Sequence, residues 1–184
     1  MTDLKNRFLF KNFMYNFNYS PSVEGYSTDD WKTLSGSPAI SGGKLRISSA
    51  EVIQYADIKG GRHNFSINIP TPDGSTDKEF GLMSKDTGEK ITFKVDGTDL
   101  VCTVTDEAGT TSSTIAWDSN WEGSVVDFVI DFSFNGTTFK IADKTIAVLD
   151  TNLPTGALSL YLKNGIADNM DVTSIKSEGV ETYI

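Results

Sequence analysis

The sequence is poor in the residues that build metal centres and nucleophile sites. It has one cysteine and one histidine in 184 residues. Cys102 has no partner for an intrachain disulfide and sits in an alternating run, so we expect a small buried hydrophobe rather than a reactive thiol. His63 follows two glycines and is interpreted as a turn residue. One histidine cannot supply a multi-histidine zinc site, so no metal and no cofactor are predicted.

Long apolar runs and an excess of positive charge are also missing. No stretch approaches about 18 consecutive apolar residues, the length of a membrane span. Residues 1–20 lack the apolar centre of a secretory signal, which predicts synthesis in a cytoplasm. Sixteen lysines and arginines stand against 25 acids, a net charge of −9. Because phosphate backbones and anionic membranes attract clustered cations, we expect neither nucleic acid nor a membrane as a partner.

The sequence is instead rich in short alternating segments. Turn pairs such as Gly42-Gly43 and Asp96-Gly97, which tolerate positive φ angles, separate them. No long run carries a helical stripe. The sequence therefore predicts an all-β fold, a two-sheet antiparallel β-sandwich with one core. The expected strands are 44–48, 51–58, 64–69, 79–84, 90–95, 99–105, 110–117, 125–134, 137–142, 144–149, 156–163 and 171–177.

The strand expected at 125–134 indicates which face should be buried. Its apolar residues alternate with a second set that includes Asp127 and Asp131. We expect the apolar set to face the core and the acidic set to meet water or a ligand. The apolar set is Phe128, Ile130, Phe132 and Phe134.

Residues 1–20 differ in composition from the sandwich domain expected at 21–184. They carry a net charge of +2 and are rich in aromatic side chains, several of which alternate like a strand. Two interpretations stay open: a first core strand, or an arm that docks on other protein subunits, a homo-oligomer included. The aromatic side chains are Phe8, Phe10, Phe13, Tyr15, Phe17 and Tyr19.

Several segments over residues 31–177 together resemble the concanavalin A-like jelly roll, the fold shared by laminin-G-like domains, legume lectins and laminarinase-type glucanases. The resemblance implies two curved antiparallel sheets, one of them concave, and glycan binding as the commonest use of the fold. The segments are ISGGKLRI at 40–47, NFSI at 64–67, DFVIDF at 127–132, LPTGALSLYLKN at 153–164 and DNMDV at 168–172.

The glucanases of this superfamily carry their nucleophile and acid in a Glu-x-Asp-x-x-Glu run, which this sequence lacks. Asp127 and Asp131 share a strand face, but four residues separate their backbones by about 13 Å. Retaining hydrolysis needs carboxyl groups about 5 to 5.5 Å apart, and inverting hydrolysis about 6.5 to 9.5 Å. We therefore expect no catalytic residue and no enzyme. The comparison considers two carboxylates on one strand, so it does not detect carboxylates that separate strands bring together.

A glycan, if bound, would stack its sugar rings on aromatic planes beside polar side chains. Tyr161 alternates with leucines and is expected to be exposed on the opposite face. Trp117 and Trp121 flank a turn, where packing at the sandwich edge is the alternative. The candidates are Tyr55, Trp117, Trp121, Asp127, Asp131 and Tyr161.

An oxygen-rich cluster precedes the last expected strand. Asp168, Asn169 and Asp171 have the ligand type that calcium prefers. A solvated turn explains the same residues and is the preferred interpretation.

These observations favour a non-catalytic structural or attachment protein, such as a capsid decoration, fibre or tail component of a phage or other virion, with glycan recognition as a further activity. This interpretation is supported by the absence of a recognisable set of catalytic residues, by the acidic composition of residues 21–184 and by the basic, aromatic composition of residues 1–20. The alternatives are a carbohydrate-binding module and, least favoured, a glycoside hydrolase of laminarinase-like fold.

Overall fold

The structure is a computed structural model, which describes residues 9–16, 31–72 and 78–182. In these ranges the only helix is the 3₁₀ turn η2 (Ser119–Trp121), and no helix has the length and apolar character needed to cross a membrane. The strands are β1 (Leu9–Asn16), β2 (Trp31–Ser35), β3 (Ala39–Ser41), β4 (Lys44–Ile47), β5 (Ala50–Ile58), β6 (Gly61–Asn68), β7 (Lys78–Met83), β8 (Lys90–Asp96), β9 (Asp99–Thr105), β10 (Thr110–Ala116), β11 (Val125–Ser133), β12 (Gly136–Ile141), β13 (Lys144–Leu149), β14 (Leu158–Asn164) and β15 (Met170–Thr182).

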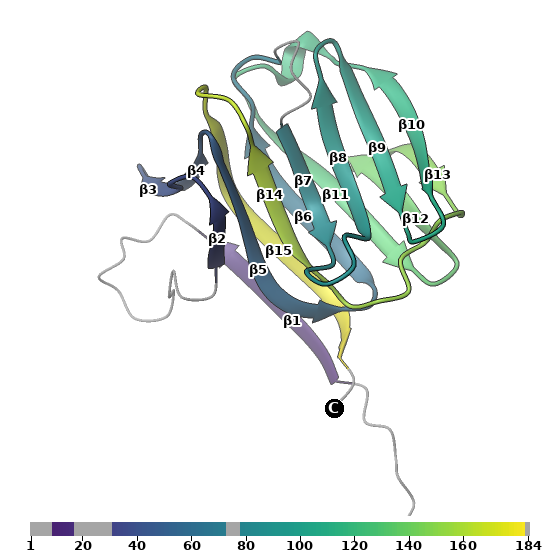
Figure 1. Cartoon of the computed structure of the whole chain (residues 1–184). Coiled ribbons are helices and arrows are strands. Elements are labelled where there is room, and N and C mark those ends of the chain that lie inside the picture. Colours follow the sequence, from purple (N-terminus) through teal and green to yellow (C-terminus); the bar gives the residue numbers. More distant parts are fainter. Residues whose placement is uncertain (1–8, 17–30, 73–77, 183–184) are drawn as a thin grey trace, which may run out of the picture.

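These strands form two antiparallel sheets packed face to face (Figure 1). An eight-stranded sheet has the order β13-β12-β11-β6-β15-β4-β3, with β1 also paired to β15. A seven-stranded sheet has the order β10-β9-β8-β7-β14-β5-β2. The arrangement confirms the predicted all-β, two-sheet antiparallel sandwich.

All the expected strands from residue 44 onward are present, most with bounds shifted by no more than two residues. Two strands, β2 and β3, were not expected from the sequence. Both lie at the end of a sheet and most of their side chains are exposed, so they carry little of the alternation that marks a half-buried strand. The turn at Gly42-Gly43 does join β3 to β4, with φ angles of 59° and 72°, as a two-residue hairpin of this kind requires.

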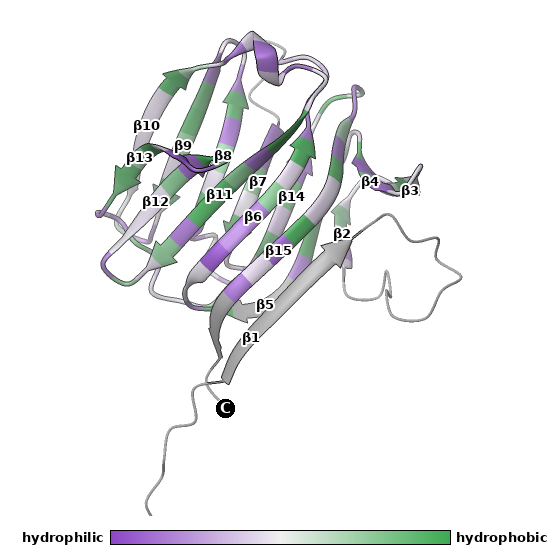
Figure 2. Cartoon of the chain, turned by 180° about the vertical axis from the view of Figure 1, so that it is seen from behind, coloured by the Kyte–Doolittle hydropathy of each residue, from purple (hydrophilic) through white to green (hydrophobic). Residues whose placement is uncertain are grey.

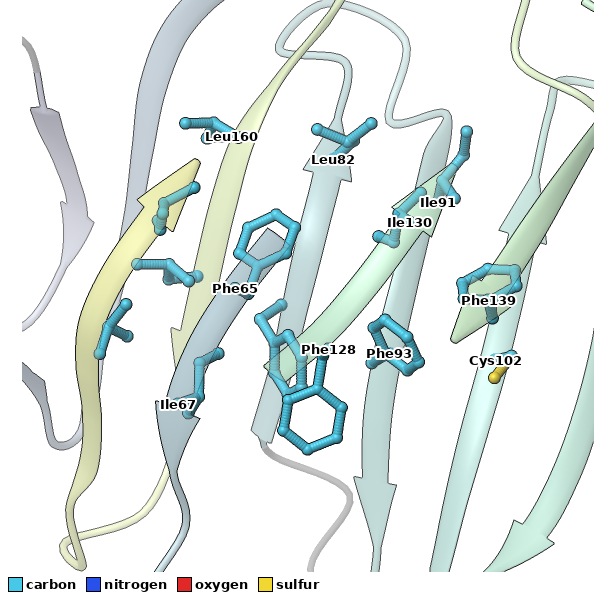
Figure 3. Close-up of a cluster of buried hydrophobic side chains, with 14 of the residues drawn as sticks. Phe65, Ile67, Leu82, Ile91, Phe93, Cys102, Phe128, Ile130, Phe139 and Leu160 are labelled. Atoms are coloured by element: carbon cyan, nitrogen blue, oxygen red, sulfur yellow. The ribbon is translucent and has the colours of Figure 1, made fainter. Parts of the chain in front are cut away.

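The core lies between the sheets and is centred on phenylalanines contributed by both (Figure 3). The Phe80 ring centroid lies 4.9 Å from that of Phe128 and 5.5 Å from that of Phe93. Phe93 in turn meets Phe139 edge to face at 5.1 Å. Cys102 is fully buried in this core, where desolvation raises the pKa of its thiol to about 12. The expectation of a small buried hydrophobe is confirmed.

Two predictions about individual side chains are wrong. Phe128, Ile130 and Phe132 are buried as expected, but Phe134 is 85% exposed, because β11 ends at Ser133 and the chain turns there into β12. His63 is not a turn residue: it lies in β6 with its side chain fully buried, since it shares the inward face of that strand with Phe65 and Ile67.

The backbone of β1 pairs with the second half of β15, from Leu9 opposite Thr182 to Asn16 opposite Ser174 (Figure 1). This pairing makes residues 9–16 a strand of the eight-stranded sheet, while burial of its aromatic side chains in the core stays a prediction. Docking on another subunit stays a prediction. Outside the described residues lie Phe8, Phe17 and Tyr19, together with the side chains of Phe10, Phe13 and Tyr15.

Candidate functional site

The described residues among those selected from the sequence as glycan contacts fall into separate groups. Asp127 and Asp131 lie on the outward face of the eight-stranded sheet, seen from the front in Figure 2, where Asp127 accepts a hydrogen bond of 2.5 Å from the Ser66 hydroxyl. Tyr161 belongs to the other sheet. The side chain of Tyr55 lies outside the described residues. Glycan binding at any one of them stays a prediction, but the described ones form no common site.

Trp117 and Trp121 pack together beside η2. Their rings meet edge to face at 5.2 Å, and Trp121 also lies 6.5 Å from the Phe128 ring. Both side chains are partly buried against the core. Packing at the sandwich edge therefore accounts for the position of both indoles.

The oxygen-rich cluster near the start of β15 is held by the protein's own cations. The Lys78 ammonium, 1% exposed, lies 3.0 Å from a carboxylate oxygen of Asp168. Arg46 donates two hydrogen bonds to Asp171, at 2.8 and 3.0 Å. Among the described residues no three acids, histidines or cysteines are grouped as a metal site would need. The solvated-turn interpretation is wrong for Asp171, which is buried in this ion pair.

A polar cluster that the sequence analysis missed lies on the outward face of the seven-stranded sheet. In β7, Phe80 and Leu82 point into the core, so Glu79 faces outward, because neighbouring strand residues point to opposite faces. The same alternation in β14 places Tyr161 outward between two core leucines.

Strand register arranges this cluster as two neighbouring rows across β5, β14, β7 and β8. In each row, residues on adjacent strands lie directly opposite one another. The charged row is Glu51, Lys163, Glu79 and Lys94. The tyrosine row is Ile53, Tyr161, Gly81 and Thr92.

Glu79 is a buried carboxylate with two strong donors. Its Oε1 accepts a hydrogen bond of 2.7 Å from the Thr92 hydroxyl and lies 2.8 Å from the Lys90 ammonium. The residue is only 7% exposed. Hydrogen bonds that involve an ionised partner are short and strong, so this carboxylate is fixed in one position on β7.

Tyr161 links the two rows. Its hydroxyl donates a hydrogen bond of 2.8 Å to Oε1 of Glu51. Burial raises the pKa of this hydroxyl, and the bond to Glu51 and the charges of Glu79 and Glu51 raise it further. The predicted face is right but the predicted exposure is wrong. Tyr161 is 3% exposed, because its ring leans along the sheet toward a diagonal neighbour instead of standing out into water.

Gly81 leaves the tyrosine row without a side chain between Tyr161 and Thr92. Its φ angle is +148°, and a Cβ added there would lie 2.3 Å from the Ile91 carbonyl oxygen, 2.9 Å from Thr92 Cα and 3.0 Å from Cδ1 of the core residue Ile130. No other residue fits this backbone without a shift. The close approach of β8 and of the core therefore explains the glycine at this position.

The charged row brings two carboxylates together from separate strands. Glu51 and Glu79 are separated by β14 alone, so their backbones lie about 9.5 Å apart, two strand spacings. This is within reach of the separation used in inverting hydrolysis, unlike the spacing of Asp127 and Asp131. One feature of the sequence could have pointed to this site. In the run Glu79-Phe80-Gly81 a glycine lies inside an expected strand, two residues after an acid, and a glycine there indicates a close approach of the backbone to a neighbour.

Comparison with solved structures identifies the fold as the concanavalin A-like jelly roll. A lichenase (β-1,3-1,4-glucanase) from a mouse hindgut metagenome matches with a TM-score of 0.73 and 10% identity, covering 93% of this chain and 100% of that one. The Bacillus licheniformis β-glucanase matches at 0.70 and 12%, covering 90% and 97%. The Crh5 transglycosylase matches at 0.71 and 14%, covering 91% and 84%. No protein-family model and no curated protein sequence matches the chain.

These likenesses correct the functional expectation. The sequence analysis favoured a non-catalytic structural or attachment component of a virion and no enzyme. That interpretation is wrong, because the structures that share this fold over nine-tenths of the chain include glucanases, a laminarinase and a transglycosylase. The expected likeness to the concanavalin A-like superfamily is confirmed at the level of the fold.

Proposed function

We propose that the chain is a glycoside hydrolase, in which Glu51 and Glu79 are the reacting carboxylates. The observation that carries this proposal is the charged row, where both acids face outward on strands separated only by β14. The names of the fold's relatives, a β-glucanase and a lichenase among them, make a β-linked glucan the first substrate class to test.

The surroundings of the two carboxylates assign them different roles. Glu79 is buried, lies 2.8 Å from the Lys90 ammonium and accepts a hydrogen bond from Thr92, and this fixed position suits a base that accepts a proton from water. Glu51 is more exposed, so a glycosidic oxygen can reach it, which suits the acid. Tyr161 is a positioning residue, because its hydroxyl orients Glu51.

In the proposed reaction, the protonated Glu51 gives its proton to the glycosidic oxygen as the bond from that oxygen to the anomeric carbon breaks. The oxygen of a water molecule bonds to the anomeric carbon from the other face and loses a proton to Glu79. The wide separation of the two backbones leaves room for that water, so we expect inversion at the anomeric carbon.

The test measures release of reducing ends from mixed-linkage β-glucan and from laminarin. Glu79→Gln and Glu51→Gln each keep the side-chain shape and remove the proton-transfer function, so each should lower kcat by about 10²- to 10⁴-fold. Glu107→Gln is the matched control, since Glu107 is an exposed acid between β9 and β10. Activity that survives both row variants, or a wild-type protein that releases no reducing ends from any β-glucan, would contradict the proposal.

A further inference from the structure

We propose that the glycan taken by the outward face is anionic, carrying carboxylate or sulfate groups, and that Lys94 and Lys163 bind those groups. This inference names the substrate class of the proposed hydrolase and so rests on the proposed function. It starts from the two lysines of the charged row, which lie on either side of Glu79.

Neither lysine has a partner in the part of the chain that the structure describes. Lys163 lies opposite Glu51 on one side and Glu79 on the other, and Lys94 lies opposite Glu79. Neither forms an ion pair or hydrogen bond with any residue that the structure describes. The glutamates are occupied elsewhere, Glu79 by Lys90 and Thr92 and Glu51 by Tyr161.

Both lysines are also held close to the sheet. Each residue is half-buried, as is usual for a lysine whose aliphatic stem packs on a sheet while its ammonium meets water. Strand register places one lysine on either side of Glu79.

The local charge is opposite to that of the whole chain. Three ammonium groups and two carboxylates gather at the charged row when Lys90 is included, a local charge of +1. The chain as a whole carries −9. An anionic polymer is repelled by most of such a surface and is attracted where cations collect, so charge alone directs it to this face.

The two lysines are placed to meet one sugar. They lie on β14 and β8, the neighbours of β7 on its two sides, and flank Glu79 in the charged row. A ring bound beside Glu79 would place its substituents toward Lys94 on β8 and Lys163 on β14. An acidic substituent there would form an ion pair that no described residue provides.

The experiment measures binding by affinity electrophoresis of the wild-type protein with one soluble β-glucan in three forms: neutral, carboxymethylated and sulfated. We expect the anionic forms to bind more tightly and to lose affinity as salt rises, because salt screens exposed charge pairs. Lys94→Gln and Lys163→Gln should each weaken binding of the anionic forms by about two- to fivefold and leave the neutral form unchanged. A preference between the two anionic forms identifies the group that is bound.

Lys44→Gln is the matched control, because Lys44 is half-buried, forms no ion pair with a described residue and lies on β4 of the other sheet. Equal or tighter binding of the neutral glucan overturns the inference, and so does an equal loss in the control. If a neutral glucan is cleaved without any preference for anions, the proposed function stands and this inference fails. If anionic glucans bind through the lysines but none is cleaved, the inference stands and the hydrolase proposal fails.

Discussion

The hydroxyl of Tyr161 donates a hydrogen bond of 2.8 Å to Glu51, diagonally across the pairing of β14 with β5. It is the only described hydrogen bond between the charged row and the tyrosine row besides the one from Thr92 to Glu79. The two bonds draw the two carboxylates toward different neighbours, Glu51 toward β14 and Glu79 toward β8. The spacing of the acids is thus set by side chains as well as by the strands.

Replacing Tyr161 by phenylalanine should disturb Glu51 and leave the fold intact. The variant keeps the ring and loses one hydrogen bond, which contributes about 1 kcal/mol to the free energy of unfolding. If Tyr161 positions Glu51, kcat on a β-glucan should fall by about tenfold with KM little changed. An unchanged kcat would show that this bond serves stability alone.

The same variant should be less sensitive to alkali. The pKa of Tyr161 is raised in the folded state, so above the ordinary tyrosine pKa of about 10 the unfolded chain loses a proton that the folded chain keeps. This contribution to stability is complete below pH 10 and is lost as the pH rises further. Urea unfolding at pH 8 and pH 10.5 should therefore show a larger loss for wild type than for Tyr161→Phe. The other tyrosines are common to both proteins and cancel in the comparison.

His63 should make the protein sensitive to mild acid. Burial lowers its pKa to about 4, against an ordinary value of 6.5, and its Nδ1 lies 2.9 Å from the Ser177 hydroxyl. Between these two pH values the unfolded chain binds a proton that the folded chain does not. Stability therefore falls as the pH drops from about 6.5 to about 4, by as much as a few kcal/mol. His63→Gln should flatten this part of the curve in urea unfolding at pH 7, 5.5 and 4.5, and parallel curves for the two proteins would show that His63 is not the group responsible.

The sequence predicted the fold because a two-residue alternation reports directly on a half-buried strand. In β11 it placed Phe128 and Phe132 in the core correctly. The alternation gave the wrong prediction for Phe134, because the alternating pattern continues in the sequence past Ser133, where the strand ends. It failed for His63 because the neighbouring glycines indicated a turn, although residues on the same side of β6 are buried.

The candidate site was hidden for a different reason. Glu51 and Glu79 lie on strands far apart in the chain, and β14, from much later in the sequence, is inserted between them. Only the strand order reveals that they share a row. Alternation likewise predicts the face on which Tyr161 lies, but not the direction of its side chain along the sheet, which decides its burial.

Gly81 should tolerate no side chain. In Gly81→Ala the new Cβ would meet the Ile91 carbonyl at 2.3 Å at a φ of +148°, so a neighbouring strand must move. Gly88→Ala is the control: its φ is +75°, but nothing lies within 4 Å of the added Cβ. We expect the control to lose about 1 kcal/mol of stability from backbone strain alone. Gly81→Ala should lose clearly more in thermal or urea unfolding, and equal losses would mean that the strands adjust freely at the site.

Phe132 and Phe134 lie two residues apart, but their truncation should change the free energy of unfolding by very different amounts. Phe132 is 4% exposed and Phe134 is 85% exposed, although the sequence assigns both to one face. Phe132→Ala removes a core ring and should cost about 3 kcal/mol, the low end for such a change. The low value is expected because Phe132 lines a groove of about 460 Å³ with Leu153 and Pro154 at the end of the sandwich, where the surroundings can relax.

Phe134→Ala should change the free energy of unfolding by no more than about 0.5 kcal/mol, as for other exposed positions. Urea unfolding of the two variants measures both effects in the same local sequence. A loss in Phe134→Ala as large as that in Phe132→Ala would mean that the Phe134 ring covers the groove in solution. Losses below 1 kcal/mol in both variants would contradict the burial of Phe132. The inward-facing row of β11 would then end before Phe132.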